Sequence, residues 1–433
     1  MTDLGPHTGN EARRRAEAIL TTSLVESYDP FSPAVMANPL PFYKALRDHD
    51  PVHYLPEYDT FAVSRFDDVW NTLGDVSGAF LSSESSLPLP STLRTHNDGP
   101  VPDPPTEPMG SSNMFGSPVY ERFRHATGRP LRPGGVGRLT GWIHDRARTR
   151  LRELLDRGEP FDLAQDYGGH VAAGAVCRLM GLPTELAADV LNVVNSSTGT
   201  HLTEGGLDKV TLFRRSMEIL SPQVAKARAD ADARSPMVGG LLDMDFAGRE
   251  LTDDEIAVNL VCVFVGGTET VPKVAAHGLW ELAKDPAQLA AVRADLAANA
   301  VTARDEAIRY CAPAQWFLRT AREPAEIAGT PVRPGQRVMA LVASAARDER
   351  EFDAPDEFRW DRTIARSLSF GRGQHFCIGV HLAKLEVAVL IEEFLAGVSD
   401  YEIDADAAVR HPSSFQWGWN VVPVRASAAR AGA

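Results

Sequence analysis

The sequence is poor in cysteine, with four residues in a chain of 433: Cys177, Cys262, Cys311 and Cys377. No two of them form a CxxC pair, which argues against both a disulfide framework and a structural zinc site. The chain also lacks an apolar segment near residue 1 and any run of about 18 apolar residues. We therefore predict no signal peptide, no membrane span and a reducing, cytoplasmic setting.

Positive charge is also scarce. Lys and Arg number 44 against 58 Asp and Glu, which gives a formal net charge of −14. A general nucleic-acid binder needs a positive face for the phosphates, so this class of protein is disfavoured. With 44% hydrophobic and 24% charged residues, the composition is that of a soluble globular protein.

The order of patterns predicts one large, mainly helical unit with a small β portion. Residues 1–27 are expected to form an N-terminal leader, and 28–433 a single domain. We expect a helix near 39–49, short strands near 51–55 and 60–64, and a helix that begins at Asp67 or Asp68. The pattern is mostly helical from 120 to 300, and short strands return after 313.

Residues 81–119 interrupt this organisation. They are rich in Ser, Pro and Gly and show no sustained period. Connections of this length are usually functional or disordered. We interpret the segment as a loop over a site, with a disordered linker as the alternative.

The longest helical pattern begins at a capping box, with Thr252 as N-cap and Glu255 three residues later. The helix is expected to extend to about Lys284. Because its middle is apolar on all sides, it should cross the protein core.

The centre of this helix contains residues that helices avoid. The Gly266–Gly267 pair forms helix poorly, and Pro272 has no N–H to donate to the carbonyl of Thr268. We therefore expect a loosened point where Glu269 and Thr270 meet water or a ligand. A kinked core helix with incidental polar residues is the alternative, although a buried Glu is rare unless it is paired.

The stretch SFGRGQHFCIG, residues 369–379, sets Cys377 among three glycines. A nucleophilic cysteine needs a base, and His375, two residues away, rarely has that geometry. A phosphate loop needs Lys and Ser or Thr after its glycines, and neither follows here. A lone thiolate ligand to a metal remains. One thiolate beside glycines that admit a bulky planar group is typical of thiolate-bound haem, and a Cys/His hydrolase is the alternative without haem.

These residues resemble the motifs of the cytochrome P450 family. FGRGQHFCIG is similar to the family's haem loop, F-x-x-G-x-[HR]-x-C-x-G, and the matching residues are Phe370, Gly373, His375, Cys377 and Gly379. GGTET at 266–270 resembles the distal-helix motif [AG]-G-x-[DE]-T, and EAIR at 306–309 resembles ExxR. The three motifs stand in the family's order, and the resemblance covers the chain from about residue 30. It implies the cytochrome P450 fold of the soluble bacterial type.

The resemblance also implies a cofactor and its binding residues. The cofactor is haem b (iron protoporphyrin IX), with Cys377 as the metal ligand. The other implied cofactor-binding residues are His375, Arg319, Arg124, Tyr120, Gly266, Gly267, Phe370, Gly373 and Gly379. His375, Arg319 and Arg124 would be cationic partners of the haem propionates.

Further roles follow from the same resemblance. Thr270 and Glu269 are implied as the catalytic pair that delivers protons, with room for oxygen at the neighbouring glycines. Glu306, Arg309 and Arg362 are implied to form a buried ion network. Taken alone, the spacing of Glu306 and Arg309 is that of an ordinary pair on one helix face.

The chain departs from the family pattern at two places. Many soluble members have His where Tyr120 stands, and a phenol donates one hydrogen bond but carries no charge at neutral pH. Many relatives carry Thr or Ser after the catalytic threonine, whereas this chain has Val271 and then Pro272. These departures concern the binding of a propionate at Tyr120 and the water path near Thr270.

The implied activity is monooxygenation, most simply hydroxylation, of an apolar or aromatic small molecule by a monomeric enzyme. No flavin or nicotinamide module fits beside this domain, so electrons should come from a separate ferredoxin and its reductase, docked near Arg372. The pocket candidates are Met114, Phe115, Val263, Trp316, Phe317, Phe415, Trp417 and Trp419, although core packing explains such residues equally well. Dealkylation, oxidative coupling, peroxide-driven oxidation and a non-catalytic haem-binding sensor are the alternatives.

Overall fold

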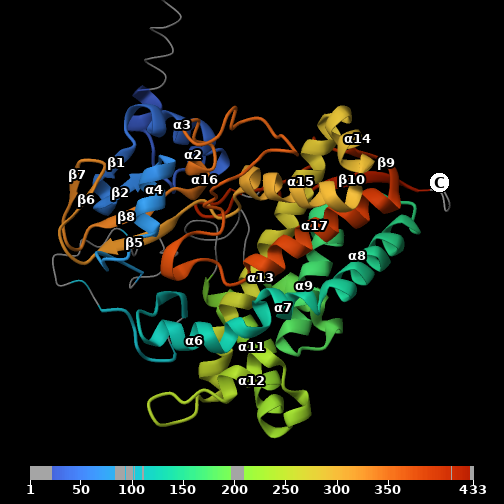
Figure 1. Ribbon diagram of the computed structural model, residues 1–433, viewed down its shortest axis with the longest axis horizontal. Helices are drawn as coiled ribbons and strands as arrows, with labels where there is room; N and C mark the ends of the chain where they lie inside the picture. The colour runs from blue at the N-terminus through green and yellow to red at the C-terminus, as the bar shows by residue number, and fades with distance from the viewer. Residues whose placement is uncertain are drawn as a thin grey trace, which may run out of the picture.

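The computed structural model describes residues 22–82, 93, 101, 103–109, 112–196, 209–410 and 412–429. It confirms a large helical portion with a small β portion (Figure 1). The helices are α2 (Pro33–Ala37), α3 (Leu40–His49), α4 (Phe66–Leu73), α6 (Val119–Gly128), α7 (Pro133–Gly137), α8 (Thr140–Leu155), α9 (His170–Met180), α10 (Ala187–Ser196), α11 (Lys209–Ala229), α12 (Pro236–Leu242), α13 (Asp253–Lys284), α14 (Pro286–Ala294), α15 (Leu296–Cys311), α16 (Val342–Ala345) and α17 (Val380–Gly397). The strands are β1 (Val52–Leu55), β2 (Thr60–Val63), β3 (Phe80–Leu81), β4 (Phe161–Asp162), β5 (Phe317–Ala321), β6 (Ala325–Ile327), β7 (Thr330–Val332), β8 (Arg337–Ala340), β9 (Val398–Ile403) and β10 (Pro423–Ala428).

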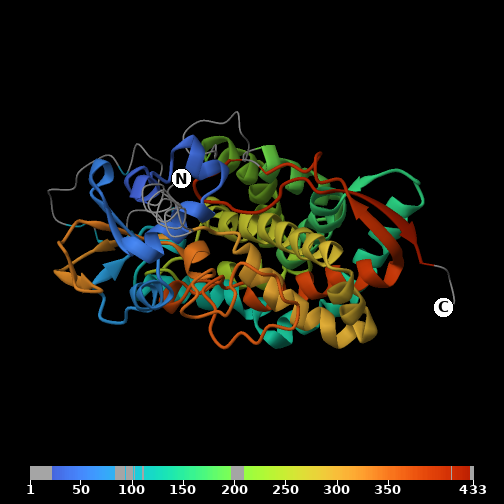
Figure 2. The ribbon, with the colours of Figure 1, turned by 90° about the horizontal axis from the view of Figure 1, so that it is seen from above.

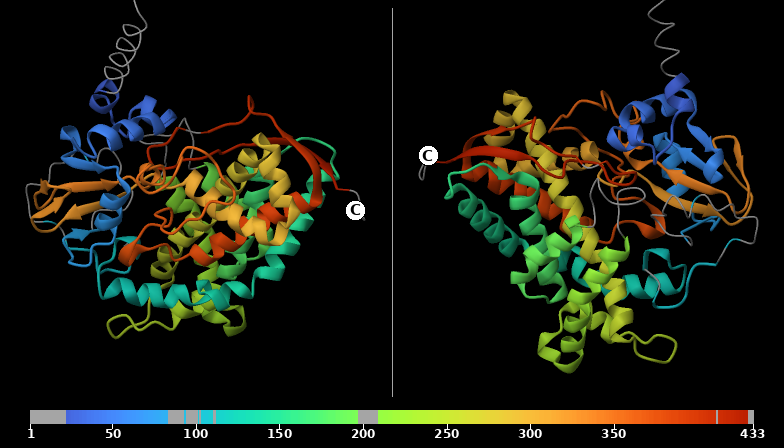
Figure 3. Two further views of the ribbon diagram at one scale, coloured as in Figure 1. Left: turned by 45° about the horizontal axis from the view of Figure 1, so that its top comes forward. Right: turned by 180° about the vertical axis from the view of Figure 1, so that it is seen from behind.

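The strands form three small sheets, with the orders β1-β2-β8-β5-β3, β4-β10-β9 and β6-β7. In the first sheet, β2 and β8 are parallel, with Thr60 opposite Arg337, and the other neighbours are antiparallel. Figures 1 and 3 show this sheet at one end of the molecule, away from most of the helices. The strands expected near 51–55 and 60–64 are confirmed. Their sheet is larger than that pair alone indicated, because β8 and β5 join it from far along the chain.

The helix expected near 39–49 is confirmed as α3. The helix expected to begin at Asp67 or Asp68 begins earlier, at Phe66, with Arg65 as N-cap. The two carboxylates lie in its first turn, where the helix dipole favours negative charge. An acidic first turn therefore marks the helix start only to within a turn.

Parts of two expected segments lie outside the described residues. Of the leader expected over 1–27, residues 1–21 are not described, and 22–26 are helical. Of the loop expected over 81–119, residues 83–92, 94–100, 102, 110 and 111 are not described. Its described ends contain β3 and the short helix η2 (Ser112–Met114), which precedes α6.

The long helix has the predicted ends, with a complete capping box at Thr252 and its last residue at Lys284. The expected loosened point is wrong, because α13 is one continuous α-helix through Pro272. The hydroxyls of Thr268 and Thr270 each donate to a carbonyl one turn back, at 2.7 and 3.0 Å. A segment of π-helix, η4 (Leu163–Gly169), packs its backbone closely against the proline ring. Tertiary packing thus keeps the helix intact where its sequence is unfavourable.

The core is built around α13, which contacts α9, α10, α11, α15 and α17 and runs through the middle of the molecule in Figure 2. Among the described residues, it is the one helix long and apolar enough to cross a membrane, yet 61% of its most apolar window is buried inside the protein. This burial is what a core helix needs, because its apolar side chains are already removed from water.

Candidate functional site

The cysteine loop is held by glycines with backbone conformations that other residues rarely adopt. Gly371 and Gly373 have φ of 69° and 73°. A Cβ at Gly373 would lie 2.4 Å from the carbonyl oxygen of Leu73, so α4 leaves no room for a side chain. The N–H of Cys377 then donates to the carbonyl of Phe370 at 2.9 Å. The loop therefore presents the cysteine at a defined point just before α17.

The Cys377 side chain is partly exposed, and the pKa of its thiol is raised overall, although two neighbouring groups oppose the effect of burial. Burial raises the pKa of its thiol, while a hydrogen bond from the backbone of Gly379 and the charge of Arg124 lower it. In contrast, Cys177 and Cys311 are buried, and burial raises the pKa of each to about 12. Cys377 is thus better suited to hold a metal as a thiolate than these two cysteines.

Four polar side chains from three elements meet beside this cysteine. Arg124 of α6 donates to the hydroxyl of Tyr120 at 2.7 Å, and the Tyr120 ring lies 4.3 Å from the ring of His375. Arg319 of β5 is 7% exposed and donates to the carbonyl of Leu318. Burial lowers its pKa to about 10. Among the described residues, no carboxylate pairs with Arg124 or Arg319, so the cluster has two positive charges available for an anion.

His375 is a neutral member of this cluster. Burial, followed by the charges of Arg319 and Arg124, lowers its pKa to about 4. Two neighbouring guanidinium groups thus disfavour a third positive charge on His375, which was expected to be a cationic partner of the propionates. Among the described residues, no hydrogen bond joins His375 to Cys377, so the dyad of a cysteine hydrolase is not formed.

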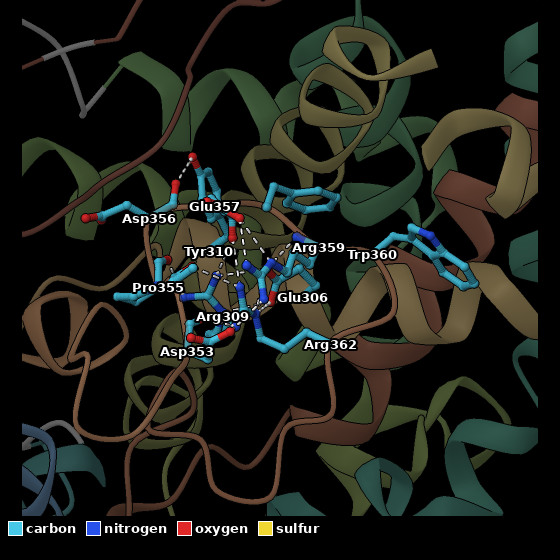
Figure 4. A network of polar contacts seen from close by, with 12 residues as sticks. Glu306, Arg309, Tyr310, Asp353, Pro355, Asp356, Glu357, Arg359, Trp360 and Arg362 are labelled. Carbon is cyan, nitrogen blue, oxygen red and sulfur yellow. Dashed lines mark hydrogen bonds and ion pairs between the residues drawn. The ribbon is translucent and has the colours of Figure 1, made fainter. Parts of the chain in front are cut away.

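The expected ion network is present, with Glu306 and Arg309 fully buried and Arg362 partly exposed (Figure 4). Arg309 donates to both oxygens of Glu306, at 2.7 and 2.8 Å, and Arg362 donates to the same carboxylate at 3.1 Å. The backbone N–H of Arg359 adds a bond of 2.9 Å. Both arginines also donate to backbone carbonyls between residues 346 and 357. The network joins α15 to the chain segment that precedes the cysteine loop.

The centre of α13 presents different residues to different sides. Val263, Gly266, Gly267 and Thr270 are at least partly exposed, although they lie in the middle of a core helix. A Cβ at Gly266 would meet no atom within 4 Å, whereas one at Gly267 would lie 2.6 Å from Cγ2 of Val176. Gly266 therefore leaves room beside the helix. Gly267 instead permits close packing against α9, which corrects the expectation that both glycines make room.

Glu269 is buried beside Thr270, and its carboxylate pairs with another residue. Lys273 donates to its Oε1 at 2.9 Å, and both side chains are about 5% exposed or less. No hydrogen bond joins Glu269 to Thr270 among the described contacts. The two residues expected to act together thus lie on different sides of the helix, about 100° apart at ~3.6 residues per turn.

The pocket candidates fall into two groups. Met114, Val263, Phe317, Phe415 and Trp419 are partly exposed. In contrast, Phe115 and Trp316 are 1% exposed and Trp417 is 6% exposed. These three are core residues, which corrects their assignment to a pocket wall, because large aromatic surfaces are stabilised by full burial. Trp316 also donates its indole N–H to the carbonyl of Ser414 at 2.6 Å.

Comparisons with known proteins agree with this geometry. The sequence model of the family described as cytochrome P450 matches residues 217–415. A curated relative, cytochrome P450 123 of Mycobacterium tuberculosis, is 29% identical over 92% of this chain and 97% of its own length. A steroid C26-monooxygenase of Rhodococcus jostii is 26% identical over 93% of this chain and 84% of its own. The structure of cytochrome P450 CYP109Q5 from Chondromyces apiculatus is 27% identical and superposes with a TM-score of 0.76, covering 93% of this chain and 99% of that one.

The chain belongs to the cytochrome P450 family. The resemblance found in its motifs and the expected fold are confirmed. Cytochromes P450 use haem to oxidise their substrates, so this chain is an oxidoreductase of the monooxygenase class.

The residues of this cytochrome P450 fit a haem group. Arg124 and Arg319 have unneutralised charges suited to two propionates, and Gly266 leaves space beside α13. Cys377 is a partly exposed sulfur with a backbone donor. Among the described residues, no group of three or more His, Cys, Asp or Glu side chains that could hold a metal ion occurs.

Sequence reasoning missed two contacts of this site. Lys273 follows Glu269 at the i,i+4 spacing, which would have predicted their ion pair. Arg372 lies over the ring of Trp70, 3.7 Å from its centroid, and no local pattern indicates that contact. The Arg372 side chain therefore packs against Trp70. A residue that docks a ferredoxin was instead expected to extend from the protein surface.

Proposed function

We propose that this cytochrome P450 binds haem b through Cys377 and hydroxylates an apolar or aromatic small molecule with electrons from a separate ferredoxin. When bound, the haem supplies the activation of dioxygen. The observation that carries the proposal is the combination of one cysteine that accepts a backbone hydrogen bond with two unneutralised arginines beside it, the buried Arg319 and the partly exposed Arg124. Haem b requires a ligand to its iron from the protein, and a thiolate can serve as that ligand. Its two propionates carry two negative charges, which two arginines can neutralise.

In this proposal, the cysteine loop holds the iron and the arginine cluster holds the propionates. The backbone of Gly379 donates to Sγ of Cys377 and so adjusts the electron density that the sulfur donates. Arg124 and Arg319 bind the carboxylates, while Tyr120 and neutral His375 add hydrogen bonds without charge. Phe370 receives the cysteine N–H through its carbonyl and so belongs to the framework of the loop.

Proton delivery is assigned to Thr270 and Glu269. The hydroxyl of Thr270 donates to the carbonyl of Gly266, so its lone pairs are free to accept a hydrogen bond from water in the space beside that glycine. Glu269 has one oxygen bonded to Lys273, and its other oxygen accepts no described hydrogen bond. A carboxylate and an alcohol on adjacent residues can pass a proton through ordered water.

The substrate class is inferred from the partly exposed side chains. Val263, Phe317 and Phe415 offer apolar surface, and Phe317 lies near Gly371 of the cysteine loop. Apolar walls with few polar groups suit an apolar ligand. A relative named for oxidising a steroid supports this class.

Electron transfer from a ferredoxin needs a positive surface near the cysteine loop. Arg122, Arg129, Arg132 and Arg138 are exposed and have no described acidic partner. Their segment lies beside the loop, because Gly128 abuts Ile378. In a chain with net charge −14, such a group favours an acidic partner protein. Replacing Arg129 and Arg132 by Ser should slow ferredoxin-dependent reduction and weaken its salt dependence, and Arg425→Ser is the control.

The first test is the absorption spectrum of the reduced protein with carbon monoxide. A strongly red-shifted Soret band that Cys377→Ala abolishes is the expected result. Cys262→Ala is the matched control and should leave the band unchanged. Absence of haem after expression with a haem supply would overturn the proposal. NADPH consumption with a ferredoxin and its reductase then separates an enzyme from a non-catalytic haem protein.

A further inference from the structure

The pair Lys273–Glu269 is connected to a distant part of the chain. Besides the 2.9 Å bond to Glu269, the ammonium group of Lys273 donates to Oε1 of Gln416 at 2.8 Å. Gln416 is 143 residues further along and lies in the C-terminal segment 413–420. The lysine therefore bridges two acceptors, one on its own helix and one on this segment.

The backbone of Gln416 is held in place by residues 313–316. It forms an isolated antiparallel bridge with Ala314 and accepts a bond of 3.0 Å from the Gln315 side chain. On either side, Gln315 N–H donates to Phe415 and Trp417 N–H donates to Pro313. Because these bonds fix the main chain at residue 416, its side chain meets Lys273 from a defined position.

The C-terminal segment also lies close to α13 at this point. Gly418 has φ of 120°, and a Cβ there would lie 3.1 Å from Sγ of Cys311 and 3.3 Å from Cβ of Lys273. A glycine is needed both for this backbone conformation and for the close approach. The contact between the segment and the lysine is thus a packed interface.

An ammonium group is expensive to bury unless acceptors surround it. Lys273 is 3% exposed and uses two of its three donors on Glu269 and Gln416. Removal of the amide oxygen would leave the lysine with the carboxylate alone. Lys273 would then be held less firmly, and the Glu269 carboxylate that it binds would be positioned less precisely.

We propose that Lys273 is a positioning residue that, through Gln416, ties the Glu269 carboxylate to the C-terminal segment. This rests on the proposed function, in which Glu269 relays protons. The same segment carries Phe415, a candidate pocket wall that packs against Phe317 with ring centroids 6.2 Å apart. Phe415 and Gln416, the residue that anchors the relay, are therefore neighbours in one fixed segment.

The first experiment measures the physical link in the haem-loaded protein. Lys273→Met, Gln416→Leu and the double variant form a double-mutant cycle on the midpoint of urea unfolding. We expect the two shifts to be non-additive, because either change breaks the same contact. Gln165→Leu is the matched control. Gln165 donates to the carbonyl of Asn420 in the same segment but has no contact with Lys273, so its shift should add. If Lys273→Met does not fold, Glu269→Gln replaces it in the cycle.

The second experiment measures proton delivery without any added substrate. With a ferredoxin and its reductase, one NADPH and dioxygen yield hydrogen peroxide with one proton taken up. Two NADPH, one dioxygen and two protons yield two water molecules. Gln416→Leu should raise the ratio of peroxide to water at least twofold, because a displaced carboxylate delivers protons less effectively. Gln165→Leu should leave this ratio unchanged.

Each outcome has one meaning. Additive shifts for Lys273→Met and Gln416→Leu would overturn the link. An unchanged peroxide ratio in Gln416→Leu, or an equal change in Gln165→Leu, would overturn the positioning role. A chain without thiolate-bound haem would refute the proposed function instead, and the cycle would then report on the link alone.

Discussion

Two buried carboxylates in this cytochrome P450 have very different surroundings. Glu306 accepts hydrogen bonds from Arg309, Arg362 and the backbone of Arg359, on both of its oxygens. Glu269 accepts one described bond, from Lys273, on one oxygen. Both are 6% exposed or less, so burial does not distinguish them. The number of hydrogen-bond donors distinguishes the two carboxylates. A carboxylate bonded on both oxygens is fixed, whereas one bonded on a single oxygen can accept from other partners on its second oxygen.

The comparison teaches that a buried ion pair can serve structure or chemistry. Breaking a buried pair by removal of one partner leaves an uncompensated charge, whatever the pair contributed while it was intact. Where three donors surround the carboxylate, that cost should appear mainly in stability. Where a single donor binds the carboxylate, the effect of the substitution should appear mainly in activity.

The largest effect is expected at Arg309. Arg309→Met removes the bidentate partner of Glu306 and leaves the backbone carbonyls of Ala346 and Pro355 without their donor. We expect a loss of about 3–5 kcal/mol in the free energy of unfolding, measured by urea titration. Arg359→Met is the matched control, because its side chain contacts exposed carboxylates while its backbone makes the bond to Glu306. An equal loss in both variants would contradict the role of the buried guanidinium.

The comparison is sharpened by the same substitution in the two carboxylates. Glu269→Gln should lower ferredoxin-dependent NADPH turnover roughly 100-fold, the order expected for one proton-transfer group. Its unfolding midpoint should fall less than that of Glu306→Gln, because one buried cation loses its counter-charge here and the amide oxygen still accepts from Lys273. Glu306→Gln should instead lower the midpoint strongly, because its arginines lose their counter-charge. If Glu269→Gln keeps the parent rate, Glu269 is not the relay.

A smaller effect is expected at Thr270. Thr270→Val removes a partly exposed hydroxyl and should raise the ratio of peroxide to water about tenfold, or about 1.4 kcal/mol. Thr268→Val is the matched control. Its hydroxyl makes the same bond to a carbonyl one turn back, but the side chain is fully buried. An equal rise in both variants would show that the hydroxyls act through the helix backbone and not through water beside it.

The smallest effect is expected at Glu255, whose partner Arg249 is half-exposed. The hydrogen bond from Arg249 is the main cause that lowers the pKa of Glu255 to about 2. A lowered pKa stabilises the folded state above about pH 4.5, and this contribution is lost as the pH falls towards 2. Glu255→Gln should cost about 1 kcal/mol at pH 7, after allowance for screening, and the difference should shrink below pH 4. Glu250→Gln is the control and should cost less at pH 7, because the Glu250 side chain is exposed.

The sequence by itself determined the features whose partners lie within one helical turn or one motif. The capping box of Thr252 and Glu255 predicted where α13 begins, and EAIR predicted the pair Glu306–Arg309. The cysteine motif identified the family. Such contacts depend on local hydrogen bonds and fixed spacing, so residue types alone indicate them.

Only the tertiary structure decided the features that need distant segments to meet. It kept α13 continuous at Pro272 through packing of η4, and it made Trp316 a core residue. It brought Arg319 beside Tyr120 and Gln416 to Lys273. The free energy of these contacts comes from burial and chain packing across more than a hundred residues, and neither quantity is present in a local sequence pattern.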